Sequence, residues 1–358
     1  MILTIIGARP QFIKAAPMSA ALREAGIKEN ILHTGQHYDY NMSQKFFDDL
    51  EIPAPCHHLE VGSGNHGSQT AAMMVGIEEI CLSQQPDAVL VFGDTNSTLA
   101  AALVASKMHI PLAHVEAGLR SFNRRMPEEI NRVLTDHLSN LFFCSTEHGA
   151  ENLRKEGINS DGVHVVGDIM FDALKFTLER FPDTLNPASK ILGDAPYIAA
   201  TIHRAENTDN PDNLREIFQG FASCEWPVVC PLHPRTRSKL QHEGINTDEF
   251  PSQNLHLLEP VSYPEMLKLV AEAQAVFTDS GGLQKEAYWL KTPCRTIRPQ
   301  TEWVETVQLG YNQLKPAKAE TIARAASSIN YPGECPPIYG DGNTSPIISK
   351  ILAKTYFE

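Results

Sequence analysis

The sequence lacks an excess of basic residues. Its 30 Lys and Arg residues are outnumbered by 43 Asp and Glu residues, which gives a formal net charge of -13. A surface that binds the phosphate backbone of nucleic acid, or an anionic membrane, needs a surplus of cations. We therefore expect neither nucleic acid nor a membrane as a partner. An anionic ligand would have to be bound by a few residues at one site.

Long apolar runs and paired cysteines are also missing. No stretch of about 18 apolar residues is present, and the start, MILTIIGARPQ, lacks the regions typical of a signal peptide. The seven cysteines are odd in number and include no CxxC pair, which argues against a disulfide framework or a zinc knuckle. In CHH, residues 56–58, neighbouring side chains of an extended segment point to opposite faces. We expect a cytoplasmic protein without a metal ion.

Short β-rich segments alternate with helical ones along the whole chain. MILTIIG, AVLVFGD and LAHVEAG belong to the first half, and PYIAATIH, WPVVCPLH and AVFTDS to the second. This alternation predicts an α/β fold of parallel βαβ units. We expect two Rossmann-like, doubly wound domains facing across a cleft, an N-terminal one over residues 1–170 and a C-terminal one over residues 171–345. A last helix, 346–358, is expected to pack back on the first domain.

The segment TDSGG, residues 278–282, lies between a predicted strand and a predicted helix. Ser280, Gly281 and Gly282 would stand at the helix N-terminus, where unpaired N–H groups and the helix dipole attract an anion. Glu286, one turn later, is suited to accept hydrogen bonds from a diol such as ribose. The segment therefore fits a nucleotide diphosphate with its sugar. The alternative is an ordinary N-cap at Ser280 followed by a tight glycine turn.

A literal G-x-G-x-x-G occurs at residues 62–67, GSGNHG. It does not occupy the first strand-to-helix turn, which reads GARPQF, and no strand ending in an acidic residue follows about 20 residues later. We interpret it as a loop and expect no nicotinamide site there.

Polar residues follow other predicted strands in unusual density. The candidates are Arg9, Lys14, Asp94, Glu116, Glu128 and His203. Ligands of doubly wound folds bind at the carboxyl ends of the strands, so we expect these side chains to line a site. Each one alone also has a structural explanation, as a helix cap, an ion-pair partner or a buried histidine.

Several motifs together resemble the non-hydrolysing UDP-N-acetylglucosamine 2-epimerase family. They are GARPQFIK, TGQH, GDTNSTLA, HVEAGLR, PEEINR, GDIMFD, HRAEN, TDSGGLQKEA and TEWVE, and they span residues 2 to about 310. The resemblance implies two Rossmann-like domains arranged as in many glycosyltransferases, a homodimer, and UDP bound chiefly by the second domain.

The resemblance also assigns roles to individual residues. It implies that Asp94, Glu116 and Glu128 are the acid and base groups, and that His203 and Arg9 lie near the diphosphate. It places Ser280, Gly281 and Glu286 at the phosphate and ribose, with Lys14 and Gly282 as further binding residues. Met266 falls at the uracil pocket.

The implied reaction explains the need for several acids. The hydrogen on carbon 2 of an acetamido sugar has no adjacent carbonyl to acidify it, so its removal needs another electron sink. Expulsion of UDP from carbon 1 supplies that sink and yields a glycal, without an added cofactor. UDP then adds back, and inversion needs proton transfer on both faces. The sequence does not reveal which carboxylate is the base.

Some positions depart from the family pattern. Ala205 in HRAEN and Trp303 in TEWVE resemble the branch that acts on UDP-2,3-diacetamido-2,3-dideoxy-glucuronate. Asp39 and Ser68 put the regulatory UDP-sugar site of bacterial members in doubt. A UDP-sugar glycosyltransferase, a non-catalytic UDP-sugar sensor and a hydrolysing epimerase remain alternative classes.

Overall fold

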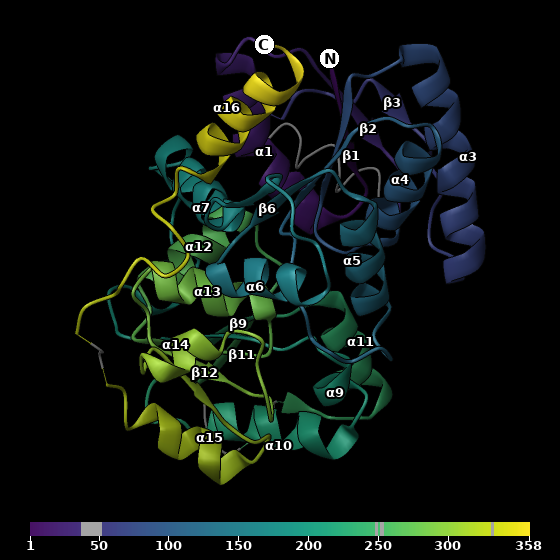
Figure 1. Ribbon diagram of the computed structural model, residues 1–358. Helices are drawn as coiled ribbons and strands as arrows, with labels where there is room; N and C mark the ends of the chain where they lie inside the picture. The colour runs from purple at the N-terminus through teal and green to yellow at the C-terminus, as the bar shows by residue number, and fades with distance from the viewer. Residues whose placement is uncertain (37–51, 248–249, 251–253, 331–332) are drawn as a thin grey trace. The chain divides into compact units, whose positions relative to one another are not determined.

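The chain forms two compact units, each built around one parallel sheet (Figure 1). The computed structural model describes residues 1–36, 52–247, 250, 254–330 and 333–358. Unit 1 comprises Met1–Thr177 and Pro337–Glu358, and unit 2 comprises Leu178–Pro336. Asp39, named above, lies outside the described residues.

Unit 1 contains a seven-stranded sheet in the order β3-β2-β1-β4-β5-β6-β7, with every pair of neighbours parallel. The strands are β1 (Ile2–Ile6), β2 (Glu29–His33), β3 (His57–His58), β4 (Ala88–Phe92), β5 (Leu112–Val115), β6 (Leu141–Cys144) and β7 (Val163–Val165). The helices are α1 (Arg9–Glu24), α3 (His66–Gln84), α4 (Asn96–Lys107), α5 (Pro127–Leu138), α6 (Glu147–Lys155), α7 (Ile169–Arg180), which runs into unit 2, and α16 (Thr344–Tyr356).

Unit 2 contains a six-stranded parallel sheet in the order β10-β9-β8-β11-β12-β13. The strands are β8 (Ile198–Thr201), β9 (Val228–Pro231), β10 (Leu255–Leu258), β11 (Ala275–Thr278), β12 (Cys294–Thr296) and β13 (Asn312–Leu314). The helices are α8 (Ser189–Leu192), α9 (Ala205–Thr208), α10 (Pro211–Ala222), α11 (Pro234–His242), α12 (Tyr263–Ala271), α13 (Gly281–Trp289), α14 (Val304–Gln308) and α15 (Ala319–Ala326).

The strand order reverses once in each sheet. In unit 1 the reversal lies between β1 and β4, and in unit 2 it lies between β8 and β11. The loops that leave neighbouring strands on the two sides of such a reversal diverge, which opens the binding position of doubly wound folds. The candidate residues Arg9 and Asp94 follow the first pair of strands, and His203 and Ser280 follow the second pair.

Both sheets are buried on both faces, as parallel sheets require. All five residues of β1 and all five of β4 are buried. In unit 2, Phe277 of β11 packs against Phe221 of α10, which in turn contacts Phe218, with ring centroids 6.1 and 5.8 Å apart. These apolar layers hold the strand ends, and hence the loops, in fixed register.

The end of the chain is tied to unit 1 before its last helix begins. The N–H of Asp168 donates to Tyr339 O at 2.9 Å, and the Asp172 carboxylate accepts from the N–H groups of Thr344 and Ser345 at 3.1 and 2.6 Å. The helix α16 then packs against α1 (Figure 1). Residues 337–345 therefore belong to unit 1, whereas the sequence placed them in the second domain. The first part of unit 1 runs to Thr177 rather than to residue 170.

The predicted α/β class with two parallel sheets is confirmed. The quoted β-rich segments all contain strands. The strand β3 was not predicted, because its two residues are too few for a periodic pattern, and β13 was not predicted either. Among the described helices, none has the length and apolar character needed to cross a bilayer.

Candidate active site

In unit 1, the loops after β1, β4 and β5 bring three of the candidate side chains together. The Lys14 ammonium of α1 forms an ion pair with the Glu116 carboxylate. A Cβ atom on Gly93, the residue before Asp94, would lie 3.2 Å from Glu116 Oε2 and 3.7 Å from Lys14 Nζ. The turn that carries Asp94 therefore runs directly beside this ion pair.

Lys14 is buried between carboxylates. Burial alone would lower the pKa of its ammonium, but the nearby charges of Glu116 and Asp94 outweigh burial and raise that pKa. A lysine charged in this way can stabilise negative charge but is not available as a base.

The backbone at Glu116 has an unusual conformation. Its φ of 70° lies in the left-handed region, which costs a residue other than glycine on the order of 1–3 kcal/mol. The N–H groups of Glu116 and Ala117 both donate to Phe143 O, at 3.0 and 3.2 Å. This conformation turns the Glu116 side chain toward Lys14, and strain of this kind is concentrated at functional sites.

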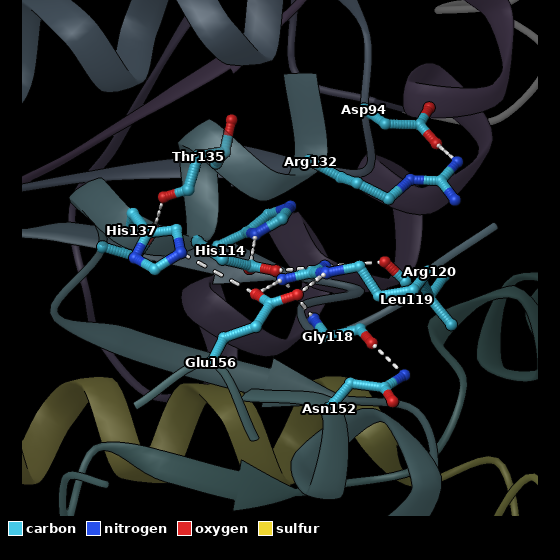
Figure 2. Close-up of polar contacts among 12 residues, drawn as sticks. Asp94, His114, Gly118, Leu119, Arg120, Arg132, Thr135, His137, Asn152 and Glu156 are labelled. Carbon is cyan, nitrogen blue, oxygen red and sulfur yellow. Dashed lines mark hydrogen bonds and ion pairs between the residues drawn. The ribbon is translucent and has the colours of Figure 1, made fainter. Parts of the chain in front are cut away.

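Asp94 has a partner that the sequence did not reveal. Figure 2 shows Arg132 of α5 directed at the Asp94 carboxylate, with which it forms an ion pair. Asn131, the preceding residue, donates to Asp94 O at 3.0 Å. Arg132 belongs to the quoted motif PEEINR, so its position was visible, but its contact with Asp94 was not.

The two glutamates at the start of α5 differ sharply. Glu129 is buried and accepts hydrogen bonds from Ser121 N and Oγ and from Phe122 N, at 2.8, 2.9 and 2.9 Å. Burial would raise the pKa of Glu129, but these bonds and the charge of Arg132 outweigh it and lower that pKa. Glu128 is exposed and makes no hydrogen bond or ion pair with the residues that the structure describes. It lies four positions before Arg132, on the same helix face.

The remaining basic candidate of unit 1, Arg9, opens α1 and is exposed. The structure thus links Lys14, Asp94 and Glu116 into one cluster, whereas Glu128 is connected to it only through its helix. Within the described part of the chain, no three His, Cys, Asp or Glu side chains are grouped to hold a metal ion.

The other motifs considered above have structural positions as well. GSGNHG leads into α3 and follows β3, at the edge of the sheet, rather than the first strand. His57 and His58 form β3.

In unit 2, a buried carboxylate organises the loop after β8. Asp279 accepts hydrogen bonds from the N–H groups of His203 and Arg204, both at 3.0 Å, and from Asn207 Nδ2 at 3.0 Å. Burial lowers the pKa of His203, the attraction of Asp279 opposes this shift, and the nearby His233 adds to it. His203 is thereby favoured as a neutral imidazole at neutral pH.

The N-terminus of α13 follows β11, as predicted. Ser280 is the N-cap and accepts from Leu283 N at 3.5 Å, so the capping alternative describes its hydroxyl correctly. A Cβ on Gly281 would lie 3.5 Å from Arg204 Nη2 and 3.6 Å from Trp303 Nε1, and one on Gly282 would have no atom within 4 Å. The helix end therefore has open space in front of it and two N–H-bearing side chains beside it.

Glu286 and Met266 lie deeper in the same unit. Glu286 is buried, and its Oε1 accepts from Tyr263 Oη of α12 at 2.9 Å. Met266, one turn later in α12, packs partly buried against the apolar cluster that includes Leu283. Tyr263 was missed from the sequence because its contact joins two helices.

The sequence that carries both units matches a known family. The sequence profile described as UDP-N-acetylglucosamine 2-epimerase matches residues 20–353. The chain belongs to this family. The predicted family and the predicted class of enzyme, an isomerase, are therefore confirmed.

Individual relatives cover nearly the whole chain. A UDP-N-acetylglucosamine 2-epimerase homolog of Methanococcus maripaludis is 50% identical over 98% of this chain and 99% of its own. The UDP-2,3-diacetamido-2,3-dideoxy-D-glucuronate 2-epimerase of Pseudomonas aeruginosa is 46% identical over 99% of each chain.

Solved structures agree with this assignment. The UDP-GlcNAc 2-epimerase of Methanocaldococcus jannaschii, in complex with UDP-GlcNAc and UDP, superposes with a TM-score of 0.88 at 42% identity, over 99% of this chain and 100% of its own. A calicheamicin glycosyltransferase superposes over 100% and 99% of the two chains with a TM-score of 0.58 at 12% identity, a likeness of fold alone. The predicted glycosyltransferase-like fold is confirmed.

The contrast between Glu128 and Glu129 generates a stability prediction. We expect Glu129→Gln to lower the free energy of unfolding by about 1–3 kcal/mol at neutral pH, because an amide cannot accept all the bonds that the buried carboxylate accepts. The matched variant Glu128→Gln should change it by less than about 0.5 kcal/mol. Chemical denaturation of both variants measures the difference.

The same comparison has a defined pH dependence. The folded-state pKa of Glu129 is lowered, so its contribution is present above the ordinary carboxylate pKa and is lost as pH falls through the folded-state value. The difference between the two variants should therefore shrink in acid, and equal stabilities at neutral pH would contradict the prediction.

Proposed function

We propose that the protein inverts carbon 2 of a UDP-linked 2-acetamido sugar, of the UDP-N-acetylglucosamine to UDP-N-acetylmannosamine type, by elimination and re-addition of UDP. The observation that carries this proposal is the cluster of Lys14, Asp94 and Glu116 at the carboxyl edge of the unit 1 sheet. Membership in the 2-epimerase family supports it.

The chemistry requires acids on both faces of the sugar. One carboxylate removes the carbon 2 proton while the bond from carbon 1 to the UDP oxygen breaks, and the electron pair of that bond leaves with UDP. Re-addition of UDP and delivery of a proton to the opposite face complete the inversion. We assign these proton transfers to Asp94, Glu116 and Glu128, with Arg132 and Lys14 holding the first two in place.

Unit 2 is assigned the nucleotide. The N-terminus of α13, with Ser280, Gly281 and Gly282, would bind the diphosphate through its N–H groups and dipole. A phosphate in the open space there would be stabilised as UDP leaves, which is the largest electrostatic demand of the elimination.

Other residues are assigned to the rest of the nucleotide. Arg9 and His203 are assigned near the diphosphate, Glu286 to the ribose and Met266 to the uracil pocket. Glu286 is pre-oriented for this role by its bond from Tyr263.

UDP-2,3-diacetamido-2,3-dideoxy-glucuronate is a second candidate substrate. Trp303 lies next to Gly281 and stacks on the Lys285 ammonium, 4.2 Å from its ring centroid. Cations therefore gather at the end of α13, where a sugar with an additional carboxylate would be favoured. The 46% identity to the Pseudomonas aeruginosa enzyme points the same way.

The resemblance also implies a homodimer, and the sequence predicts a cytoplasmic location and a reaction without an added cofactor. These statements remain predictions.

Turnover in deuterated water tests the reaction and its substrate together. We expect the product to carry deuterium at carbon 2 without added nicotinamide, because the carbon-bound proton exchanges with solvent through the carboxylates. The wild type should be assayed in parallel on UDP-N-acetylglucosamine and on the diacetamido uronate, with mass spectrometry of both products. Product without deuterium would overturn the elimination mechanism, and turnover of only one sugar would identify the substrate.

A glycine pair tests the phosphate site. Gly281→Val should weaken UDP binding by about 10-fold or more, because a branched side chain beside Arg204 and Trp303 would intrude where the phosphate would approach the helix N-terminus. Gly67→Val is the control, since Gly67 also lies in the first turn of a helix, α3, with no atom within 4 Å of its Cβ position. Equal UDP affinities in calorimetry would contradict the site.

Carboxylate variants separate chemistry from binding. Asp94→Asn, Glu116→Gln and Glu128→Gln should each lower kcat by roughly 100-fold or more, the cost of losing an acid or base, with UDP affinity nearly unchanged. Glu151→Gln removes an exposed carboxylate of α6 and serves as the control. A variant among the three that turns over like the control would be excluded from the proton transfers.

A further inference from the structure

A histidine of the unit 1 sheet is hydrogen-bonded at both ring nitrogens. His114 of β5 has no exposed surface. Its Nε2 lies 2.8 Å from Gly93 O, and its Nδ1 lies 2.7 Å from Asp136 Oδ1 of α5. Neither contact involves a residue to which a role has been assigned above.

These contacts determine which nitrogens of His114 carry hydrogen. A carbonyl oxygen only accepts, so Nε2 must donate to Gly93 O. The facing oxygen of Asp136 belongs to a carboxylate whose other oxygen, Oδ2, accepts from Gly118 N at 3.1 Å and from Arg120 Nη1 at 2.7 Å. An ionised carboxylate also only accepts, so Nδ1 must donate as well. Both ring nitrogens are therefore placed to donate hydrogen bonds.

The surroundings of this histidine hold buried charges in pairs. Burial would raise the pKa of Asp136, but His114 and Arg120 outweigh burial and lower it. Arg120 also forms a two-bond contact with Glu156, at 2.8 and 2.6 Å, and His137 lies 3.8 Å from the same carboxylate. The buried Arg120 guanidinium therefore faces two carboxylates, which is the arrangement that makes burial of charge tolerable.

The histidine fixes the turn that precedes Asp94. Gly93 has a φ of 62°, donates its N–H to Val115 O at 3.0 Å and accepts from His114 at its carbonyl. Both polar groups of Gly93 are thus bound to β5. The direction in which Asp94 leaves the turn is set by these two bonds.

The aspartate fixes the loop that follows Glu116. Its bonds to Gly118 N and Arg120 hold that loop against α5, and α5 also carries Arg132, the partner of Asp94. One histidine–carboxylate pair therefore connects the Asp94 turn, the Glu116 loop and α5.

We propose that His114 and Asp136 are positioning residues that set the geometry of Asp94 and Glu116 for proton transfer, with His114 acting as a doubly protonated bridge. This assignment rests on the proposed function for its catalytic consequence. The hydrogen-bonded bridge from Gly93 O through His114 to Asp136 does not depend on that function. The increased mobility expected for the Gly93–Asp94 turn when the bridge is removed does not depend on it either.

Two amide variants of His114 separate the two bonds. In His114→Gln the amide nitrogen can reach the position of Nε2 and donate to Gly93 O, whereas in His114→Asn it can reach only the position of Nδ1. We expect His114→Asn to lower kcat by roughly 10- to 100-fold, the scale of a small misplacement of reacting groups. His114→Gln should recover most of that loss. KM and UDP affinity should stay near wild-type values in both.

Asp172→Asn is the control for a merely structural effect. This variant also alters a buried carboxylate of unit 1 that accepts hydrogen bonds from two backbone N–H groups. The donors of Asp172, however, are Thr344 and Ser345 at the start of α16. Its kcat per folded molecule should match wild type. A wild-type kcat in His114→Asn, or equal losses of kcat in all three variants, would overturn the positioning role.

Two measurements do not depend on turnover. Nitrogen-15 spectra of the wild type at neutral pH should show a proton on both ring nitrogens of His114, and an unprotonated nitrogen would overturn the doubly protonated bridge. Hydrogen exchange at the Gly93 amide should be faster in His114→Asn than in His114→Gln. Absence of wild-type turnover on either sugar would contradict the proposed function, whereas unchanged exchange at Gly93 would overturn the bridge itself.

Discussion

Buried carboxylates hold strand-end loops in both units, and these loops carry the candidate residues Glu116 and His203. Asp136 in unit 1 and Asp279 in unit 2 have no exposed surface. Burying a carboxylate costs several kcal/mol of free energy unless hydrogen-bond donors surround it. Each of these side chains is stable in its buried position because it accepts hydrogen bonds from the backbone N–H groups of a neighbouring loop. Asp279 accepts hydrogen bonds from the N–H groups of His203 and Arg204, and Asp136 accepts one from the N–H group of Gly118. The loops are thereby fixed by charge as well as by packing.

Much of this arrangement could be predicted from the sequence, because a parallel sheet leaves a strong pattern. Strands buried on both faces read as apolar runs, and each run that ends in a polar residue marks the carboxyl edge of the sheet. Asp94, Glu116 and His203 were found in this way. The position of Ser280 at a helix N-terminus was predicted because a short glycine turn joins a predicted strand to a predicted helix.

The rest could not be predicted, because it depends on contacts between distant parts of the chain or on the rotation of a helix. The ion pair between Asp94 and Arg132 joins a strand end to a helix of another βαβ unit. Glu128 and Glu129 are adjacent in sequence, yet one is exposed and the other buried, since neighbouring residues of a helix point about 100° apart. Asp279 is part of the quoted TDSGG. Its hydrogen bonds to the loop after β8 could not be predicted, because the sequence does not show that this loop lies beside it.

The strained loop after β5 shows how these bonds determine a side-chain direction. Glu116 would gain on the order of 1–3 kcal/mol by leaving its left-handed conformation. A change of this conformation would break the hydrogen bonds from Glu116 N and Ala117 N to Phe143 O, and it would weaken the bond from Gly118 N to Asp136. Each buried polar group left without a partner costs about 1–3 kcal/mol. The three bonds together exceed the strain, so the loop cannot relax. The backbone conformation therefore directs the Glu116 side chain toward Lys14, and this pre-organisation suits the proton-transfer role that we propose for Glu116.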